Sequence, residues 1–213
     1  RFHDATIKGI FNINSWNKLS VGSEYMFDAL KSQTDNINKE SAYTIALFAQ
    51  DEIKITRSLQ ALLGLRYLYH ENFRNYATPN VALMYKLNHF NFRGSYATGF
   101  RTPTLSEMYA TDIAKTTDRM TIGNTKLKPE KSDYFSFNTE YTHSRFAVSA
   151  NLFYNKIRDM IDYNTIAQGN EALKQYGYKE VRQRDNIAKA KVKGINLSAN
   201  GYIGAGFSMN AGF

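Results

Sequence analysis

Residues 145–156 read RFAVSANLFYNK, and their side chains alternate between two kinds. One face carries Phe146, Val148, Ala150, Leu152 and Tyr154, and the other carries the polar Ser149, Asn151 and Asn155. Successive side chains of a β-strand point to opposite faces, so this period of two predicts a strand with one apolar face.

The same alternation recurs along most of the chain. In 58–70 an apolar set faces one way, with Leu59, Ala61, Leu63, Leu65, Tyr67 and Tyr69, opposed by Gln60, Gly64, Arg66 and His70. Residues 207–213 show it again, and weaker cases lie at 7–13 and 19–27. We predict about ten strands, at 5–14, 19–28, 42–55, 58–71, 78–87, 90–99, 132–142, 145–162, 180–202 and 206–213. The segment 180–202 begins polar and ends apolar, and is read as one long strand; the alternative is two pieces with a break near Asp185.

The connections between these strands alternate in length. Short turns are expected at 15–18, 56–57, 88–89, 143–144 and 203–205, and long loops at 29–41, 72–77, 100–131 and 163–179. Bacterial outer-membrane barrels have tight periplasmic turns and long extracellular loops. The pattern therefore predicts an all-β fold, an antiparallel up-and-down transmembrane β-barrel with about ten strands present as a partial barrel. Every strand should pair with the next in sequence, and all long loops should emerge at one end.

Composition agrees with strands and narrows the function. The 213 residues include no cysteine and 3 prolines, and aromatic residues make up 14%. Mean hydropathy is −0.48, and no run approaches the roughly 18 apolar residues of a membrane helix. A barrel strand shows lipid only every second residue, so low hydropathy is compatible with a membrane location. The net charge of +8 is scattered and accompanies no nucleic-acid-binding motif, so no nucleic-acid partner is expected.

Two boxes resemble those of TonB-dependent outer-membrane receptors, the family that imports iron-siderophores, haem or cobalamin. In the family, a Phe-Arg-Ala-Pro-like box leads a strand into a long extracellular loop, and an Asn-Pro-Asn-Leu-x-Pro-Glu box starts the next strand. The counterparts here read FRTP at 100–103 and NTKLKPE at 124–130. The matching residues are Phe100, Arg101, Pro103, Asn124, Leu127, Pro129 and Glu130. Further family-like pieces follow in order over residues 42–201.

The resemblance implies a receptor in the outer membrane of a Gram-negative bacterium. Its partners would be outer-membrane lipid, a small-molecule ligand and, through the plug domain, the TonB system. The family barrel has 22 strands around a plugged lumen, so we expect residues 1–213 to be a C-terminal-side portion of one barrel domain, without the plug domain. No cofactor is expected.

The long loop offers candidate ligand contacts, since binding residues concentrate on loops carried by a rigid scaffold. Cationic and aromatic side chains suit an anionic chelate, and the candidates are Arg101, Glu107, Tyr109, Arg119 and Lys126. A structural role competes with this one, in which Arg101 bridges to Glu107 or Glu130 and the boxes only bracket the loop. Pro103 should end the strand near Phe100, and Thr104 with Glu107 predicts a capping box of a short helix.

Patterns of enzyme or metal chemistry do not occur. The four histidines are His3, His70, His89 and His143, none at ligand spacing, and no HExxH, GxSxG or P-loop sequence appears. Neither enzymatic activity nor a metal site is expected. The haem receptors of the family usually carry an axial histidine between the two boxes, and residues 104–123 contain none, which weakens the haem interpretation.

Two other architectures remain open. One is a small closed outer-membrane barrel, porin-like or structural, in which strand 5–14 would pair with strand 206–213. The other is a soluble β-rich binding module with apolar residues on two facing sheets. For either barrel, the convex face should carry Leu63, Leu65, Tyr67, Phe146, Val148 and Leu152. The lumen should receive Gln60, Arg66, Arg93 and Asn151.

Overall fold

The computed structural model describes residues 1–33, 35, 37–204 and 206–213. Twelve strands dominate these residues. The strands are β1 (Phe2–Asn12), β2 (Asn17–Ser32), β3 (Ile37–Lys54), β4 (Leu59–His70), β5 (Arg74–Leu87), β6 (Phe90–Arg101), β7 (Thr111–Ala114), β8 (Arg119–Ile122), β9 (Glu130–Thr142), β10 (Phe146–Gln168), β11 (Glu180–Gly204) and β12 (Phe207–Gly212). Helices α1 (Leu105–Tyr109) and α2 (Gly169–Tyr176) and a 3-10 turn, η1 (Lys115–Thr117), lie in the connections. None of the helices in the described ranges has the length and apolar character needed to cross a membrane.

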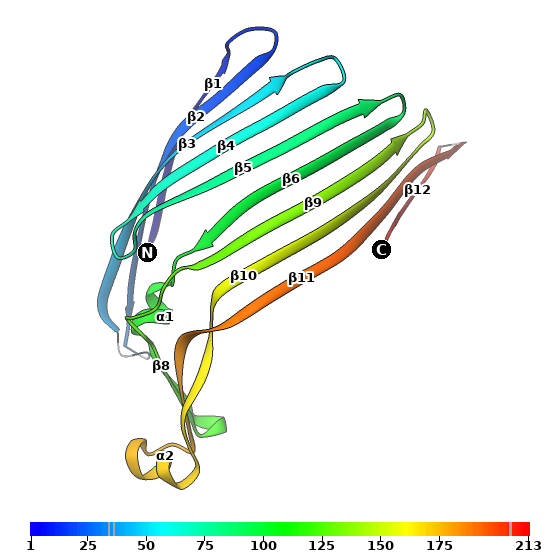
Figure 1. The fold of residues 1–213 in the computed structure, drawn as a ribbon. Coiled ribbons are helices and arrows are strands. Elements are labelled where there is room, and N and C mark those ends of the chain that lie inside the picture. The colour runs from blue at the N-terminus through cyan, green and yellow to red at the C-terminus, as the bar shows by residue number, and fades with distance from the viewer. Residues whose placement is uncertain (34, 36, 205) are drawn as a thin grey trace.

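Ten of the strands form a curved antiparallel wall (Figure 1). The order is β1 to β6, then β9, β10, β11 and β12, so each wall strand pairs with the next wall strand along the chain. In the described residues β1 and β12 pair only with β2 and β11, which leaves the two edges of the sheet apart. The wall is therefore a partial barrel, as predicted, and not the small closed barrel of the alternative interpretation.

The pairing rule fails in one place. The short strand β8 pairs with the outer end of β11 in parallel, and β7 pairs with β8. The prediction of antiparallel, next-in-sequence pairing throughout is therefore wrong for the pairing of β8 with β11, whereas β7 and β8 are consecutive and antiparallel. They belong to the long connection between β6 and β9, so no hairpin turn dictates their direction.

Two of the four predicted long loops are much shorter than expected. The described parts of β2 and β3 run through most of 29–41, and β4 and β5 leave only 71–73 between them. Residues 34 and 36 of the first loop, and residue 205 of the last predicted turn, lie outside the described residues. The predicted strand ends lie where the apolar alternation stops. The strands in fact continue beyond those positions as more polar, paired segments. Residue segment 180–202 is one strand, as predicted, although the pairing of β10 with β11 shifts register near Met160.

Helix α1 identifies the concave face of the wall. It follows β6 but contacts β2 and β3, although β4 and β5 lie between them in the sheet. A short helix can reach across two strands only on the inside of a curved sheet, so α1 lies on the concave face. Its residues Leu105 and Met108 are buried with Ala42 of β3 in the core cluster of the chain. Leu30, Phe73 and Tyr109 pack around this cluster.

The two faces of the wall differ in chemistry as the alternation predicts. Gln60 pairs in register with Met84, and Met84 with Arg93, so both predicted lumen residues lie on one face. Arg66 shares that face and forms an ion pair of 2.7 Å with Glu24. Arg93, Asn138, Asn151 and Asn196 then form one cross-strand row. The six apolar residues predicted for the convex face lie on the opposite side and are all exposed: Leu63, Leu65, Tyr67, Phe146, Val148 and Leu152.

Candidate functional site

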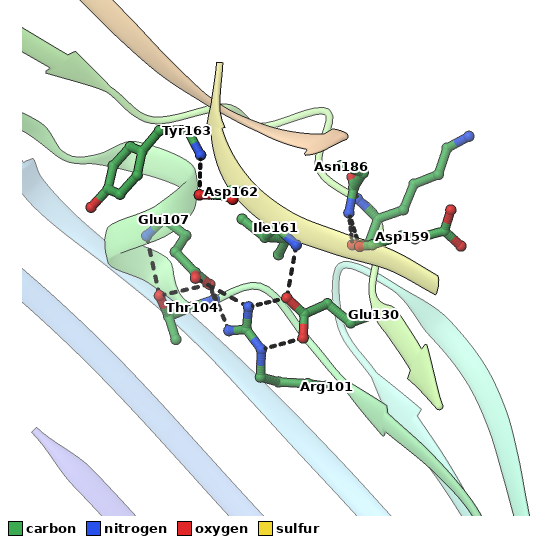
Figure 2. Close-up of polar contacts among 10 residues, drawn as sticks. Arg101, Thr104, Glu107, Glu130, Asp159, Ile161, Asp162, Tyr163 and Asn186 are labelled. Atoms are coloured by element: carbon green, nitrogen blue, oxygen red, sulfur yellow. Dashed lines mark hydrogen bonds and ion pairs between the residues drawn. The ribbon is translucent and has the colours of Figure 1, made fainter. Parts of the chain in front are cut away.

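The guanidinium of Arg101 lies between two carboxylates at the concave end of the wall (Figure 2). Nε and Nη2 donate to the two oxygens of Glu130 at 3.0 and 2.7 Å. Nη1 and Nη2 donate to the two oxygens of Glu107 at 2.9 and 3.2 Å. Bidentate pairing of this kind fixes both position and orientation. Arg101 thus joins the end of β6, helix α1 and the start of β9, a unit that we call the bracket (Arg101, Glu107, Glu130).

Local sequence explains why the bracket forms. Strand β6 ends at Arg101, two residues before Pro103, which has no N–H to donate to a sheet. Thr104 then caps α1: its Oγ1 accepts from the Glu107 N–H at 3.1 Å, and its own N–H donates to the Glu107 carboxylate at 2.9 Å. The predicted capping box is confirmed. The same Glu107 carboxylate serves both the helix cap and Arg101.

Burial and hydrogen bonding shift the pKa values of the three bracket residues. Burial of the Glu107 carboxyl raises its pKa, but hydrogen bonds from Arg101 and Thr104 outweigh burial, so the pKa of Glu107 is lowered overall. Hydrogen bonds from Arg101 lower the pKa of Glu130, burial opposes them, and the N–H of Ile161 adds a further hydrogen bond at 2.8 Å. The two carboxylates raise the pKa of Arg101 above its ordinary value. All three groups are therefore charged at neutral pH.

The second box is held by Asn186 of β11. Its Oδ1 accepts from the N–H of Lys128 at 2.7 Å, and its Nδ2 donates to the carbonyls of Lys128 at 2.9 Å and Asp159 at 2.6 Å. Asn124 reaches the same strand, since its Nδ2 donates to the Arg184 carbonyl at 2.9 Å. Leu127 and Pro129 of the box are buried. The box is therefore tied to β11, far away in sequence.

A cationic and aromatic surface lies on the outer lobe formed by β8 and the distal ends of β10 and β11. Arg119 pairs in register with Glu180, and Arg182 and Arg184 follow on the same face of β11. The guanidinium of Arg184 lies 3.9 Å from the ring centroid of Tyr163, the position opposite it on β10. The reverse face of β11 buries Val181, which is fully covered.

The structure separates the five predicted contact residues. It joins Arg101 to Glu107, places Tyr109 at the end of α1 beside the core cluster, and leaves Arg119 and Lys126 elsewhere in the loop. Sequence reasoning missed Arg182, Arg184 and Tyr163. Two arginines two residues apart in a strand were the available signal, because they must share a face. Among the described residues no cluster of three or more His, Cys, Asp or Glu is arranged to hold a metal ion.

The comparison with known protein families matches this architecture. A family model described as TonB dependent receptor-like, beta-barrel, matches residues 3–213. The chain belongs to this TonB-dependent receptor family. Its members are outer-membrane proteins of Gram-negative bacteria, so the expected membership of the family and the expected outer-membrane location are both confirmed.

The individual relatives have low sequence identity to this chain. The chain is 25% identical, over 99% of its own length and 24% of the relative's, to the probable hemoglobin and hemoglobin-haptoglobin-binding protein 4 of Haemophilus influenzae. It is 25% identical to the ferrienterobactin receptor of Escherichia coli, over 79% of the chain and 24% of that receptor. The chain thus spans about a quarter of the length of these curated relatives.

Solved receptors of the family share the fold. The siderophore receptor PirA of Pseudomonas aeruginosa superposes with a TM-score of 0.88 at 17% identity, over 99% of this chain and 41% of that one. The ferric enterobactin receptor PfeA of the same organism gives a TM-score of 0.80 at 20% identity, over 99% of this chain and 35% of that one. At such identities the likeness shows the fold, and the ligand must be argued from the side chains.

Proposed function

We propose that this chain is part of the barrel of a TonB-dependent receptor that imports a scarce nutrient, such as an iron-siderophore, haem or cobalamin. Residues 1–213 would be a portion of one barrel domain, and a plug domain elsewhere in the receptor would connect it to the TonB system. The proposal includes no enzymatic step. It is supported by the family, by relatives named for enterobactin and haemoglobin binding, and by the bracket.

The bracket is the observation that carries the proposal. Arg101 makes four hydrogen bonds to two carboxylates, and it anchors the connection 102–129 at both of its ends. A receptor loop that captures a dilute ligand benefits from such preorganisation, because less conformational freedom is lost on binding. The bracket therefore supports a rigid entrance at the outer end of the wall. We call this entrance, formed by the connection 102–129 and the distal ends of β10 and β11, the vestibule.

Within this vestibule we assign different roles to the predicted contact residues. Arg101 and Glu107 engage each other and hold the loop, whereas Arg119, Lys126 and Tyr109 remain ligand contacts. Arg184 and Tyr163 join them, because they place a cationic and an aromatic group on the face that carries Arg119, whereas Arg182 on that face is engaged with Glu180 in an ion pair of 2.7 Å. Guanidinium groups bind carboxylates and other planar anions bidentately, so an anionic iron chelate is the ligand class that this surface fits.

The convex face is proposed to contact lipid. Its exposed apolar residues form a band on the outside of the wall, and an arginine or lysine at the middle of such a band costs about 2–4 kcal/mol in a bilayer. The polar row from Arg93 to Asn196 is kept on the concave side. The wall thus has the sidedness that a transmembrane barrel requires.

Uptake by the intact receptor tests the proposal. Cells lacking their own receptors would be supplied with ferric enterobactin or haem, and iron accumulation would be measured with and without TonB. The variant Arg119→Ala/Arg184→Ala should bind and import its ligand at least about tenfold more weakly, since two charge-assisted contacts are lost. The matched control Arg57→Ala/Arg145→Ala removes two exposed arginines from the turns at the opposite end of the wall. Equal uptake by the two variants, or uptake independent of TonB, would contradict the proposal.

A further inference from the structure

A group of basic side chains lies on the convex face of β9, β10 and β11. We call this group the basic patch, and it comprises Lys131, Lys156, Arg158, Lys191 and Lys193, all exposed. Lys156 pairs in register with Asp133 and Lys191, Arg158 pairs with Lys131, and Lys193 pairs with Tyr154. Directly opposed residues of paired strands share a face. That face is the convex one, because Tyr154 shares it with Leu152 and Phe146 on β10.

The basic patch begins where the apolar band ends. Along β10 the outward side chains run from Phe146 to Tyr154 without a charge, and Lys156 and Arg158 follow. A tilted transmembrane strand needs roughly 9–11 residues to cross the hydrocarbon core, so Lys156 lies at its outer boundary. On β11 the change comes between Ile195 and Lys193. The three strands therefore place their cations at the level of the lipid headgroups.

The charges of the basic patch are not balanced within the chain. Asp133 is the one carboxylate in the patch rows, and it already accepts from Arg158 at 2.7 Å and from the Tyr96 hydroxyl at 3.1 Å. In the part of the chain that the structure describes, Lys131, Lys156, Lys191 and Lys193 make no ion pair. Lys156 directly faces Lys191, and Lys131 faces Arg158. Like charges directly opposed across strands are unfavourable, and an anion between them removes the repulsion.

The basic patch lies on three neighbouring strands of the wall. On β2, β3 and β4 the outward positions beside the apolar residues carry tyrosines, namely Tyr25, Tyr43, Tyr67 and Tyr69, and one lysine, Lys31, follows only at the end of β2. Tyrosine rings belong to the general aromatic belt of membrane barrels. A uniform ring of lysines around the barrel would serve any anionic surface, whereas a concentration on three strands marks a binding position.

From this arrangement we infer that the basic patch binds the phosphate groups of an anionic lipid in the outer leaflet, with the acyl chains on the apolar band below. The inference rests on the proposed insertion of the barrel in the membrane. Basic residues beside a membrane-embedded surface attract anionic headgroups, and the attraction is screened by salt. Charged hydrogen bonds from four lysines match phosphate oxygens. The bound lipid would be a structural partner on the outside of the wall, separate from the imported nutrient.

Lipid binding by the intact receptor tests this inference. The purified receptor in neutral detergent would be titrated with lipid A that carries two phosphates and with lipid A stripped of phosphate, and bound lipid would be counted by native mass spectrometry. The wild-type receptor should bind the phosphorylated lipid at least about tenfold more tightly. The preference should fall with added salt, since screening weakens charge attraction. Equal binding of the two lipids by the wild type would overturn the inference without any variant.

Variants then locate the site. Lys131→Gln/Lys156→Gln/Lys191→Gln/Lys193→Gln should lose most of the preference, whereas Lys54→Gln/Lys86→Gln/Lys128→Gln/Lys174→Gln, with four exposed lysines outside the basic patch, should keep it. Retention of the preference by the patch variant would overturn the assignment. Displacement of the lipid by millimolar inorganic phosphate would identify a free-phosphate site instead and also overturn it. Iron uptake is measured in parallel: its failure in the wild type counts against the proposed function, and the lipid titration stands apart from it.

Discussion

Gly123 lies against the last turn of α1, so close that a Cβ on it would stand 2.6 Å from the carbonyl oxygen of Met108. Its N–H donates to the carbonyl of Ala110 at 2.7 Å. The chain entering the second box therefore passes directly over the helix that follows the first box, and only a residue without a side chain fits between them.

Gly123→Ala should consequently loosen the vestibule without disturbing the wall. Overpacking of this kind costs roughly 1–3 kcal/mol, and the strain falls on the contact between α1 and residues 122–124. Hydrogen exchange should show faster amide exchange over α1 and the second box. Gly94→Ala is the control, since a Cβ there meets no atom within 4 Å. Identical exchange in the two variants would contradict the close approach.

Removal of the bracket arginine should release the loop at both ends. Arg101→Ala leaves Glu107 and Glu130 without their charged donor, and we expect a loss of about 1–2 kcal/mol in loop stability, moderated because the arginine is partly exposed. Arg101→Lys keeps the charge but not the fork geometry and should recover only a fraction. Limited proteolysis of residues 102–129 in the intact receptor measures the effect. Unchanged cleavage in Arg101→Ala would show that the bracket does not hold the loop.

The bracket should also open in acid. The pKa values of Glu107 and Glu130 are lowered in the folded state, so their contribution is fully present above the ordinary carboxyl value of about 4.3 and is lost as pH falls through the lowered values. Arginine stays charged throughout this range. Hydrogen exchange of the loop in the wild type should therefore accelerate below about pH 4. Glu107→Gln/Glu130→Gln should lose most of this dependence, and an unchanged profile in that variant would assign the transition to other groups.

Asn186 offers a second way to release the loop, at the box rather than the bracket. Asn186→Asp keeps the acceptor for the Lys128 N–H but removes the two donations to carbonyls. It also sets a charge beside those carbonyl oxygens, so we expect a cost of about 1–3 kcal/mol. Residues 124–129 should become sensitive to protease, whereas Asn164→Asp, in the same lobe, should not have this effect. Protection of 124–129 in Asn186→Asp would contradict this role.

The sidedness of the wall can be tested on β4. Leu65→Arg places a charge on the convex apolar face, whereas Gln60→Arg places one on the concave face, which already carries Arg66 and Arg93. The first change should lower folding stability in a bilayer by about 2–4 kcal/mol if Leu65 lies near mid-depth. The second should be close to neutral. Folding titrations of the intact receptor in lipid vesicles measure both, and equal effects would place Leu65 outside the hydrocarbon core.

Local patterns were sufficient for the wall and for the helix cap. The alternation in 145–156 specifies one face per residue, and the Thr104–Glu107 spacing specifies a capping box, because both depend on neighbours within a few positions. The contact of Asn186 with Lys128 joins residues 58 positions apart, so no local sequence pattern predicts it. The strand of residues 119–122 alternates over only four residues, which is too short a stretch to indicate its partner, so its parallel pairing with β11 was not predictable.

That parallel pairing also sets an order of events during folding. Asn124 and Arg184, joined by a hydrogen bond, are 60 residues apart, and β8 has no edge to join until the distal end of β11 exists. Closing so long a segment costs chain entropy before any contact compensates for it. The hairpins of the wall close over much shorter spans. The vestibule should therefore be the slowest part of this chain to mature, and a receptor captured early in assembly would have a complete wall and an unformed entrance.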